Sequence, residues 1–368
     1  MKKILIVEPY FGGSHKHFLE GLQKFVKADY TLITLPARKW KMRMQLAAPW
    51  VVEQIKKLQP EARYFNTVLC STFVDVAMFR SLLSGISGWN RDAIINLYFH
   101  ENQFAYPSRI KDPSLYHFTA INFNSALAAD SLAFNSIFNR DSFFSGCRRY
   151  LKYASDMHFT GLVAKLEAKS RVLYPGIDLG KFDGIDCTPK SEVPVIVWNH
   201  RWEHDKNPEE FFKAIQRLEE KKIDFRLIIL GQSFNNSPAC FKEAETLFAH
   251  KILHMGFASS YEEYMRLLGL GTVVVSTAIH EFYGISVIEA VRAGCIPVLP
   301  DRLSYPELFE KKYLYREGKL EKHLVQILKN NQIIPKDSAR QMTEKFNWQA
   351  LEKEYTAWLF SALRNGGV

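Results

Sequence analysis

Short apolar runs alternate with stretches of helical periodicity along most of the chain. The runs are four to seven residues long, whereas in stretches such as 18–26 apolar residues recur every three to four positions. Nearly continuous apolar strands are typical of parallel sheets that helices cover on both faces. The pattern predicts strands at residues 3–7, 30–35, 67–70, 93–99, 131–134, 171–174, 194–198, 225–230, 251–254, 272–276 and 295–299.

The predicted strands fall into two groups on either side of a segment with little periodicity. This segment, 176–193, contains three glycines and a proline, so we interpret it as a linker. A length of 368 residues is typical of two domains. We therefore predict a first domain at 1–175, the linker, a second domain at 194–347 and a C-terminal helix at 348–368, which we expect to cross back to the first domain.

Each half has the pattern of a Rossmann-like α/β domain. Ligands of open parallel sheets bind beyond the carboxyl ends of the strands. We therefore expect two such domains to face one another across a cleft, with the functional residues in the loops that follow strands. Two local signals support helices in the second half: Asn207 before Pro208 predicts an N-cap, and Ser260 with Glu263 has the spacing of a capping box.

The amino terminus is apolar, but Glu8 and Pro9 end that run too early for a secretory leader. No run of about eighteen apolar residues predicts a membrane-spanning helix. The five cysteines are scattered and include no C-x-x-C pair, which favours a reducing compartment. We expect a soluble, cytoplasmic protein, and nothing in the sequence predicts a protein partner.

Positive charge is concentrated in the first half of the chain. Residues 1–175 contain 23 Lys and Arg against 13 Asp and Glu, whereas residues 176–368 contain 25 against 26. This excess predicts a polyanionic partner, either a nucleic acid or an anionic membrane; a solvated basic surface is the alternative interpretation. Trp40 and Tyr150 lie beside basic clusters and could stack on a base. The residues that we expect to grip phosphates are Arg38, Lys39, Lys41, Arg43, Arg109, Lys111, Arg148 and Arg149.

Two loops have the composition of a phosphate site. Gly12 and Gly13 join a strand to a helix, where glycine lets the backbone approach a ligand, although the motif is neither G-x-G-x-x-G nor a P-loop. Arg201 and Lys206 follow the first strand of the second half, and two cations beside a helix start could stabilise a departing diphosphate. His200 and His204 lack the H-E-x-x-H pattern and an evident third ligand, so we expect no metal.

A third loop, 280–290, combines two glutamates with a helix start near Gly284. Its backbone amides could face phosphate or sugar oxygens, and Glu281 lies at the loop mouth. Glu289 is embedded in an apolar run and needs a polar partner, such as ribose hydroxyls. In the first half, His100 opens a polar run at a strand end, where we expect it to orient a sugar or acceptor. The donor residues expected in this loop are Glu281, Phe282, Tyr283, Gly284, Ile285 and Glu289.

The arrangement of Arg201, Lys206 and Glu281-x7-Glu289 resembles the donor site of retaining GT-B glycosyltransferases. The runs that begin at Glu8 (EPYFGGSHK), Leu35 (LPARKW), Tyr98 (YFHENQ), Phe134 (FNSIFN), His200 (HRWEHDK) and His280 (HEFYG) resemble the tRNA-queuosine alpha-mannosyltransferases. The resemblance covers nearly the whole chain. It implies that Arg201 and Lys206 hold the donor diphosphate, while Glu281 meets the transferred sugar and Glu289 the ribose.

The same resemblance implies GDP-mannose as the donor and the cyclopentenediol of queuosine in tRNA-Asp as the acceptor. The chain contains no D-x-D motif, which fits a GT-B enzyme without a required metal or other cofactor. Two other functions remain open: a glycosyltransferase for a lipid or polysaccharide at an anionic membrane surface, and a non-catalytic RNA-binding protein. The motifs contain no evident carboxylate nucleophile, so we expect front-face transfer with retention of the anomeric configuration.

Overall fold

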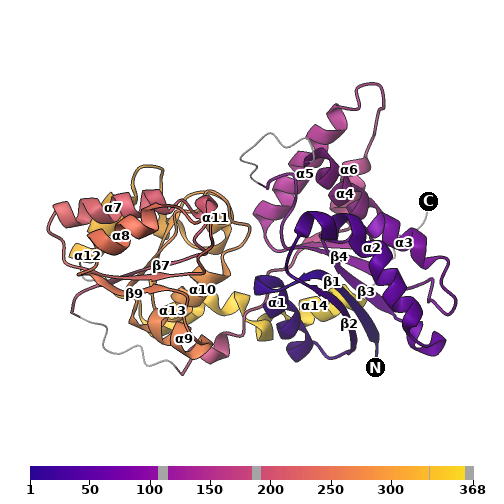
Figure 1. Cartoon of the computed structure of the whole chain (residues 1–368), viewed down its shortest axis with the longest axis horizontal. Coiled ribbons are helices and arrows are strands. Elements are labelled where there is room, and N and C mark those ends of the chain that lie inside the picture. Colours follow the sequence, from indigo (N-terminus) through magenta and orange to yellow (C-terminus); the bar gives the residue numbers. More distant parts are fainter. Residues whose placement is uncertain (107–114, 185–191, 331, 361–368) are drawn as a thin grey trace. The chain divides into compact units, whose positions relative to one another are not determined.

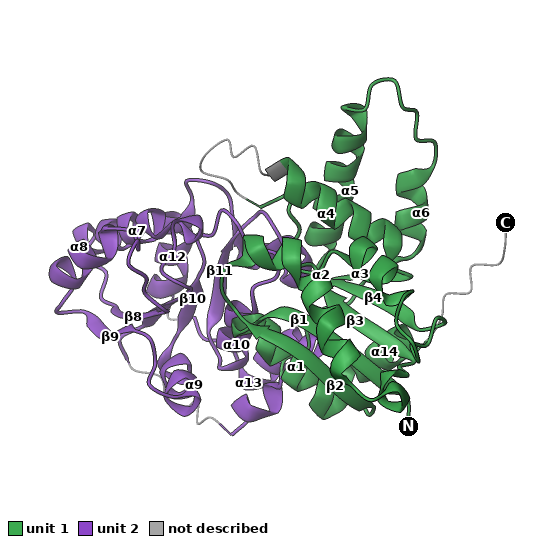
Figure 2. Ribbon diagram, turned by 45° about the vertical axis from the view of Figure 1, so that its right-hand side comes forward, with its two compact units in different colours: residues 1–177, 348–368 green, residues 178–347 purple. Residues whose placement is uncertain are grey.

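The computed structural model describes residues 1–106, 115–184, 192–330 and 332–360, which form two compact units (Figure 2). Unit 1 comprises Met1–Ile177 together with the segment from Trp348 onwards, and unit 2 comprises Asp178–Asn347. Each unit is built on a six-stranded sheet. The described strand pairs in both sheets are parallel, as the apolar strands predicted.

The sheet of unit 1 has the order β2-β1-β3-β4-β5-β6 (Figure 1). Its strands are β1 (Lys3–Phe11), β2 (Asp29–Pro36), β3 (Thr67–Ser71), β4 (Ile94–Phe99), β5 (Ser131–Phe134) and β6 (Ser170–Val172). Its helices are α1 (Gly13–Phe25), α2 (Trp40–Lys57), α3 (Val76–Leu83), α4 (Leu115–Ala128), α5 (Ile137–Lys152), α6 (Leu162–Ala168) and α14 (Trp348–Phe360), with a 3₁₀ turn at Pro60–Arg63.

Both faces of this sheet are buried. Along β1, Leu5 and Val7 belong to one apolar core, whereas Ile4 and Ile6 belong to a second core that contains α1 and α14. Since successive strand residues point to opposite faces, this division explains the unbroken apolar run. Helix α14 therefore packs within unit 1, as expected, and its Trp358 donates an indole hydrogen bond of 2.8 Å to the Ser131 hydroxyl on β5.

The sheet of unit 2 has the order β12-β11-β10-β7-β8-β9. Its strands are β7 (Val195–Asn199), β8 (Arg226–Leu230), β9 (Ile252–Gly256), β10 (Val273–Val275), β11 (Ile296–Pro300) and β12 (Leu314–Tyr315). Its helices are α7 (Pro208–Glu220), α8 (Cys240–Leu247), α9 (Tyr261–Leu270), α10 (Ile285–Arg292), α11 (Tyr305–Leu308), α12 (Leu320–Lys329) and α13 (Lys336–Thr343). Short 3₁₀ turns lie at Leu179–Phe182, His204–Lys206, Lys311–Tyr313 and Glu344–Phe346.

Each strand predicted from the sequence overlaps an observed strand. The additional strand, β12, has two residues, too few for an apolar run to mark it. The Ser260 side chain caps α9 by accepting the Glu263 amide at 3.1 Å, and Glu263 reaches back to the Ser259 amide at 2.7 Å. In the part of the chain that the structure describes, no helix is long and apolar enough to cross a membrane.

Asn207 is the N-cap of α7 and Pro208 its first helical residue, as predicted. The Asn207 backbone has φ of 50°, and its side chain makes no capping bond but donates to the Glu210 carboxylate at 2.7 Å. A 3₁₀ turn ends at Lys206, and Asn207, in the left-handed backbone conformation, joins that turn directly to α7. Within the segment predicted as a linker, Leu179 and Phe182 bury their side chains, and Asp178 already belongs to unit 2. Part of that segment, 185–191, lies outside the described residues.

Candidate functional site

The topology of unit 2 brings two of the predicted donor loops together. Strands β7 and β10 are neighbours, although β8 and β9 separate them in the chain and lie on the other side of β7. Ligands of open α/β sheets bind at such a point, where the strand order reverses. The loop after β7 contains Arg201 and Lys206, and the loop after β10 contains Glu281, so both loops leave the same edge of the sheet at this point.

Lys206 is a buried cation held by the second loop. Its Nζ donates to the His280 carbonyl at 2.8 Å and lies 3.3 Å from both the Glu281 and the Asp205 carboxylates. Burial alone would lower the pKa of Lys206, but the two carboxylates outweigh that effect and raise it. Lys206 therefore remains charged at neutral pH, and its buried ammonium group is held against the second loop.

Glu281 is the anionic partner of Lys206. One carboxylate oxygen faces the ammonium group, and the other accepts the backbone amides of Phe282 and Tyr283 at 3.1 and 3.3 Å. Burial would raise the pKa of Glu281, but the Lys206 cation and the other neighbouring groups, including the Tyr283 amide, together outweigh it, and the net shift is downward. The Ser304 hydroxyl donates to the Tyr283 carbonyl at 2.8 Å, which fixes the loop from the other side.

Arg201 lies on the exposed side of the first loop. Its side chain is 57% exposed and makes one ion pair of 2.9 Å with Glu203. The positive charge of Arg201 acts to lower the pKa of Lys206, so the two cations are close enough to repel one another. The backbone of the first loop passes close to Gly231, which has φ of +148°. A Cβ at this position would lie 1.8 Å from the His200 carbonyl oxygen.

Helix α10 starts at the end of the second loop. Its N-cap, Gly284, has φ of +107°, a backbone conformation that favours glycine, and Ile285 is the first helical residue. Asn199, the last residue of β7, donates to the Ser286 carbonyl at 3.1 Å and so ties the helix start to the first loop. The partial positive charge of the helix start therefore lies beside the Lys206–Glu281 pair.

Glu289, farther along α10, has two tyrosine partners. Its Oε1 accepts the Tyr261 hydroxyl at 3.2 Å and its Oε2 accepts the Tyr264 hydroxyl at 2.6 Å. Burial raises the pKa of Glu289 to about 7, and the hydrogen bonds from both tyrosines offset only part of that rise. The sequence indicated that this carboxyl needs a partner; the i,i+3 spacing places the two tyrosines on one face of α9 but does not show that this face meets Glu289.

The two histidines of the first loop do not form a metal site. His200 is buried, and burial together with the Lys206 charge lowers its pKa to about 4. His204 lies in the 3₁₀ turn, 3.9 Å from Glu209. Within the described residues, neither belongs to a cluster that could hold an ion.

In unit 1, His100 lies in a buried group that sequence reasoning recognised only in part. His15, on α1, places Nδ1 2.9 Å from Glu8 and Nε2 3.5 Å from Glu101. Glu8 also accepts the Ser71 hydroxyl at 3.0 Å. Burial would lower the pKa of His15, but the flanking carboxylates raise it to about 10. His15 is therefore an imidazolium between two carboxylates; the Glu8 and His15 of the EPYFGGSH run were the available signal.

His100 stacks beside this cation. The ring centroids of His15 and His100 are 3.9 Å apart, and burial together with the positive charge of His15 holds the pKa of His100 well below its usual value. His100 is thus a neutral imidazole at the carboxyl end of β4. Nitrogens of both rings and a Glu8 oxygen lie within 4.8 Å of one another, a spacing that could hold a metal ion. The proton on His15 competes with such an ion.

The diglycine turn has a structural explanation at one of its two positions. A Cβ on Gly12 would lie 2.7 Å from the Cβ of Ala37, so close packing after β2 requires glycine. Gly13 has φ of +51° and open space around its Cα. The turn thus leaves room above the first residue of α1, where we expected a phosphate contact.

The predicted basic clusters differ in their surroundings. Trp40 and Tyr150 pack against apolar cores, beside Phe118 and Phe123 respectively, so neither presents the open ring that we expected to stack on a base. Arg148 pairs with Glu167. The residues Arg38, Lys39, Lys41, Arg148 and Arg149 are exposed and Arg43 is half-buried, whereas Arg109 and Lys111 lie outside the described residues.

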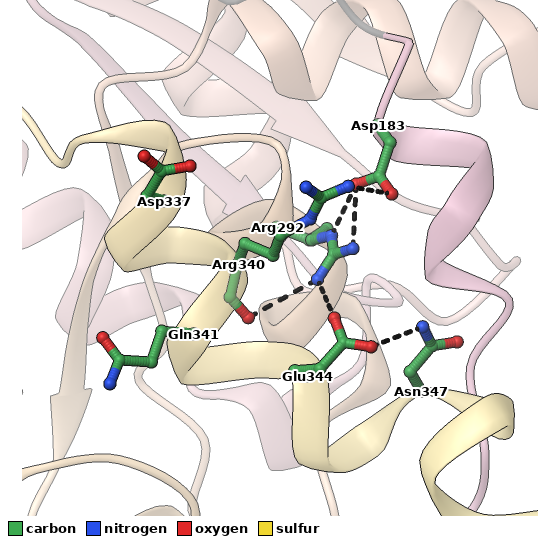
Figure 3. A pocket seen from close by; sticks show the side chains of 7 residues that line it. All are labelled: Asp183, Arg292, Asp337, Arg340, Gln341, Glu344 and Asn347. Carbon is green, nitrogen blue, oxygen red and sulfur yellow. Dashed lines mark hydrogen bonds and ion pairs between the residues drawn. The ribbon is translucent and has the colours of Figure 1, made fainter.

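A second charged pocket in unit 2, of about 590 Å³, lies at the other end of α10 (Figure 3). Arg292 is buried there and makes ion pairs of 2.8 Å with Asp183 and 2.9 Å with Glu344. Arg340 pairs with the other oxygen of Asp183 at 2.6 Å. Since these carboxylates already neutralise the arginines, we interpret the group as an anchor for the carboxyl end of α10.

Comparisons with known proteins concern the family and the fold of the chain. Residues 3–177 match the family model of the tRNA-queuosine alpha-mannosyltransferase N-terminal region, and residues 187–346 match that of glycosyl transferases group 1. A tRNA-queuosine alpha-mannosyltransferase of Drosophila melanogaster is 33% identical over 323 residues, which cover 85% of this chain and 83% of the relative. A GDP-mannose:cellobiosyl-diphosphopolyprenol alpha-mannosyltransferase of Xanthomonas campestris is 28% identical over 144 residues, 38% of this chain and 37% of the relative.

Among solved structures, the apo form of the lipopolysaccharide outer core galactosyltransferase WaaB is similar, with a TM-score of 0.67 and 14% identity over 99% of this chain and 100% of that one. At this identity the likeness shows the fold, which is GT-B, as predicted. The Drosophila match, at 33% identity over 85% of this chain, shows the family as well as the fold. The chain belongs to the tRNA-queuosine alpha-mannosyltransferase family.

Proposed function

We propose that this protein is a hexosyltransferase that moves mannose from GDP-mannose to a cyclopentenediol hydroxyl of queuosine in tRNA-Asp. Family membership supports the reaction, and the named donor of the Xanthomonas relative supports GDP-mannose. The structural observation that carries the proposal is the buried Lys206–Glu281 pair beside the start of α10. A fixed cation, a carboxylate and a helix start together suit a sugar diphosphate.

In this proposal the diphosphate binds to Lys206 and Arg201. Lys206 already has three oxygen partners, so in this proposal a phosphate oxygen replaces one of the two carboxylates at its ammonium group. Arg201 can leave Glu203 for a phosphate oxygen, because an exposed ion pair contributes only ~0–1 kcal/mol. Backbone amides at Gly13 and around Gly284 and Ile285 would take further phosphate or sugar oxygens.

The two glutamates would each contact a different sugar of the donor. Glu281 would accept hydrogen bonds from the transferred mannose, near Phe282 and Tyr283, and Glu289 would accept those of the ribose. Each oxygen of Glu289 already receives one tyrosine hydroxyl and retains a further lone pair for a ribose hydroxyl. His100, held neutral, can both donate and accept a hydrogen bond when it orients a sugar or acceptor hydroxyl.

The proposed transfer retains the anomeric configuration. The bond between the anomeric carbon and the β-phosphate oxygen breaks, and its electron pair stays with the phosphate. The acceptor hydroxyl oxygen bonds to the same face of the sugar and gives its proton to a β-phosphate oxygen. Lys206 and Arg201 stabilise the charge that develops on the diphosphate. The step requires no redox partner, and we propose that it requires no metal.

We propose tRNA as the polyanion that binds the basic first half, in the cytoplasm. Arg38, Lys39, Lys41, Arg43, Arg109, Lys111, Arg148 and Arg149 remain the proposed phosphate contacts. These contacts position the RNA without reading its sequence. Binding should therefore weaken steeply as the salt concentration rises.

Incubation with GDP-mannose and queuosine-containing tRNA, with EDTA present, tests the proposal. The expected result is a nucleoside heavier by one hexose after digestion and mass spectrometry. The same tRNA with guanine in place of queuine is the matched control and should gain nothing. Absence of the hexose, or mannose transfer to a lipid of anionic vesicles instead, would reject the proposed acceptor; activity that depends on added metal would reject the metal-free step.

A further inference from the structure

Two exposed tyrosines meet at the surface of unit 1. Tyr153 follows the last residue of α5 and is 74% exposed, and Tyr116, in the first turn of α4, is 60% exposed. Their ring centroids lie 6.2 Å apart, and the ring planes are almost perpendicular, at 85°. Each ring thus supports the other by an edge contact and keeps most of its surface open to solvent. Exposed aromatic clusters of this kind are typical of binding surfaces.

Tyr153 begins the loop of a projecting hairpin. Figures 1 and 2 show the end of α5 and the loop to α6 extending away from the rest of unit 1. We call residues 148–161 the α5–α6 arm. Its loop is exposed from Ser155 to Gly161 and includes the apolar side chains of Met157 and Phe159. These side chains add apolar surface to the same exposed loop that Tyr153 begins.

Positive charge accompanies the rings. Arg149 and Lys152 lie on the last turn of α5 and are exposed, and in the described part of the chain neither makes an ion pair. Arg148, one residue earlier, is neutralised by Glu167. The arm therefore offers two cations beside open aromatic faces, a combination that suits a polyanion with flat rings.

The base of the arm is also packed against the loop that follows His100. Phe104 of that loop lies against Gly146 of α5, where a Cβ would come within 2.4 Å of it, and its ring centroid is 6.0 Å from that of Tyr150. Asn102 donates to Asn139 of the same helix at 2.8 Å. These contacts hold α5, from which the arm extends, against the loop that follows His100.

We infer that the α5–α6 arm binds unpaired bases of an RNA loop, with bases stacked on Tyr153 and Tyr116 and phosphates beside Arg149 and Lys152. The inference rests on the proposed function and specifies which part of the tRNA unit 1 grips. An RNA duplex keeps its bases stacked and is bound through its shape, phosphates and 2′-hydroxyls, for which exposed tyrosines have no use. Unpaired bases, in contrast, stack readily on aromatic side chains.

Binding of queuosine-containing tRNA to single variants separates ring contacts from charge contacts. Tyr153→Ala or Tyr116→Ala should weaken binding about 5- to 150-fold, the range for loss of one base-stacking ring, without changing the salt dependence. Tyr153→Phe keeps the ring and should restore most of that affinity. Arg149→Gln or Lys152→Gln should instead reduce the slope of log affinity against log salt by about 0.7. Tyr64→Ala, at another exposed tyrosine of unit 1, is the matched control and should bind as the parent does.

Three results would overturn the inference: unchanged tRNA affinity in both tyrosine-to-alanine variants, an equal loss of affinity for a fully paired RNA duplex, or anionic-vesicle binding that Tyr153→Ala abolishes. The last result would assign the arm to a membrane. The proposed function fails separately, if the parent enzyme binds the tRNA but adds no hexose. In that case loss of loop binding in the tyrosine variants would still establish the arm as an RNA site.

Discussion

The hydroxyl of Tyr264 lies 2.6 Å from Oε2 of Glu289, and the two half-buried side chains meet where α9 packs against α10. Tyr261, one turn earlier on α9, holds the other carboxylate oxygen. The carboxyl group is therefore fixed in orientation by donors on both oxygens. Its pKa of about 7 nevertheless shows that burial opposes ionisation more strongly than the two hydroxyls favour it.

Donor binding should consequently depend on pH. Ribose hydroxyls donate most strongly to an ionised carboxylate, so deprotonated Glu289 is the binding form. With a pKa of about 7, the Kd for GDP-mannose should fall roughly tenfold between pH 6 and pH 8. Glu289→Gln should bind more weakly at pH 8 and show a flat profile. Calorimetric titration measures both, and a flat profile for the parent protein would contradict the assigned role of Glu289.

Arg201→Ala should separate catalysis from stability. Removal of a charge that stabilises the departing diphosphate should lower kcat by about 10²–10³. Affinity for tRNA should stay nearly unchanged, and so should the melting temperature, because Arg201 is exposed. Arg217→Ala removes a comparably exposed, ion-paired arginine of α7 and serves as the control. Unchanged turnover in Arg201→Ala would remove its proposed role.

Lys206→Met should behave differently, because Lys206 is buried. Its loss leaves Glu281 and Asp205 without their cation, and removal of one partner of a buried pair costs about 3–5 kcal/mol. Adding Glu281→Gln should recover part of that loss. Urea unfolding of the parent, the single variants and the double variant gives the coupling free energy. Additive losses would show that the two side chains do not stabilise one another.

The donor loops could be located from the sequence because parallel strands impose a simple rule. Apolar runs marked β7 and β10, and the polar residues directly after them had to lie at one edge of the sheet. Lys206 and Glu281 meet there, 3.3 Å apart. The partners of Glu289 could not be found in this way, because contact with Tyr264 depends on how α9 packs on α10, which helical periodicity does not specify.

The proposed RNA surface shows the same limit. The basic residues at the end of α5 were evident, but the exposed ring beside them is not the one that we expected. Tyr150 points into the core and Tyr153, three residues later, is exposed. An α-helix with apolar residues on more than one side gives no clear rotational phase in sequence, and α5 ends at Lys152, just before Tyr153. Tyr116 joins it from a different helix, so only the tertiary structure pairs them.

His15 should remain protonated far above the range usual for histidine. Its pKa is raised to about 10 in the folded protein, so its interaction with Glu8 and Glu101 stabilises the fold fully below pH 6.5 and is lost as pH rises towards 10. NMR titration of the imidazole nitrogens should show both nitrogens of His15 protonated at pH 8, while His100 is neutral. His15→Gln should lack the alkaline loss of stability. A His15 that titrates near 6.5 would contradict this assignment.

Arg292 should be the one arginine of the second pocket whose loss destabilises unit 2. Its side chain is 2% exposed and makes ion pairs with Asp183 and Glu344. The Arg340 side chain is 52% exposed and makes an ion pair with Asp183. Arg292→Met removes charged hydrogen bonds worth about 1.5–3 kcal/mol each and should lower the urea midpoint clearly. Arg340→Ala should cost ~0–1 kcal/mol. Because α10 starts beside Glu281 and ends at Arg292, loosening its carboxyl end should also raise the KM for GDP-mannose. Equal losses of stability in the two variants, or an unchanged KM in Arg292→Met, would show that this group does not anchor the helix that holds the donor.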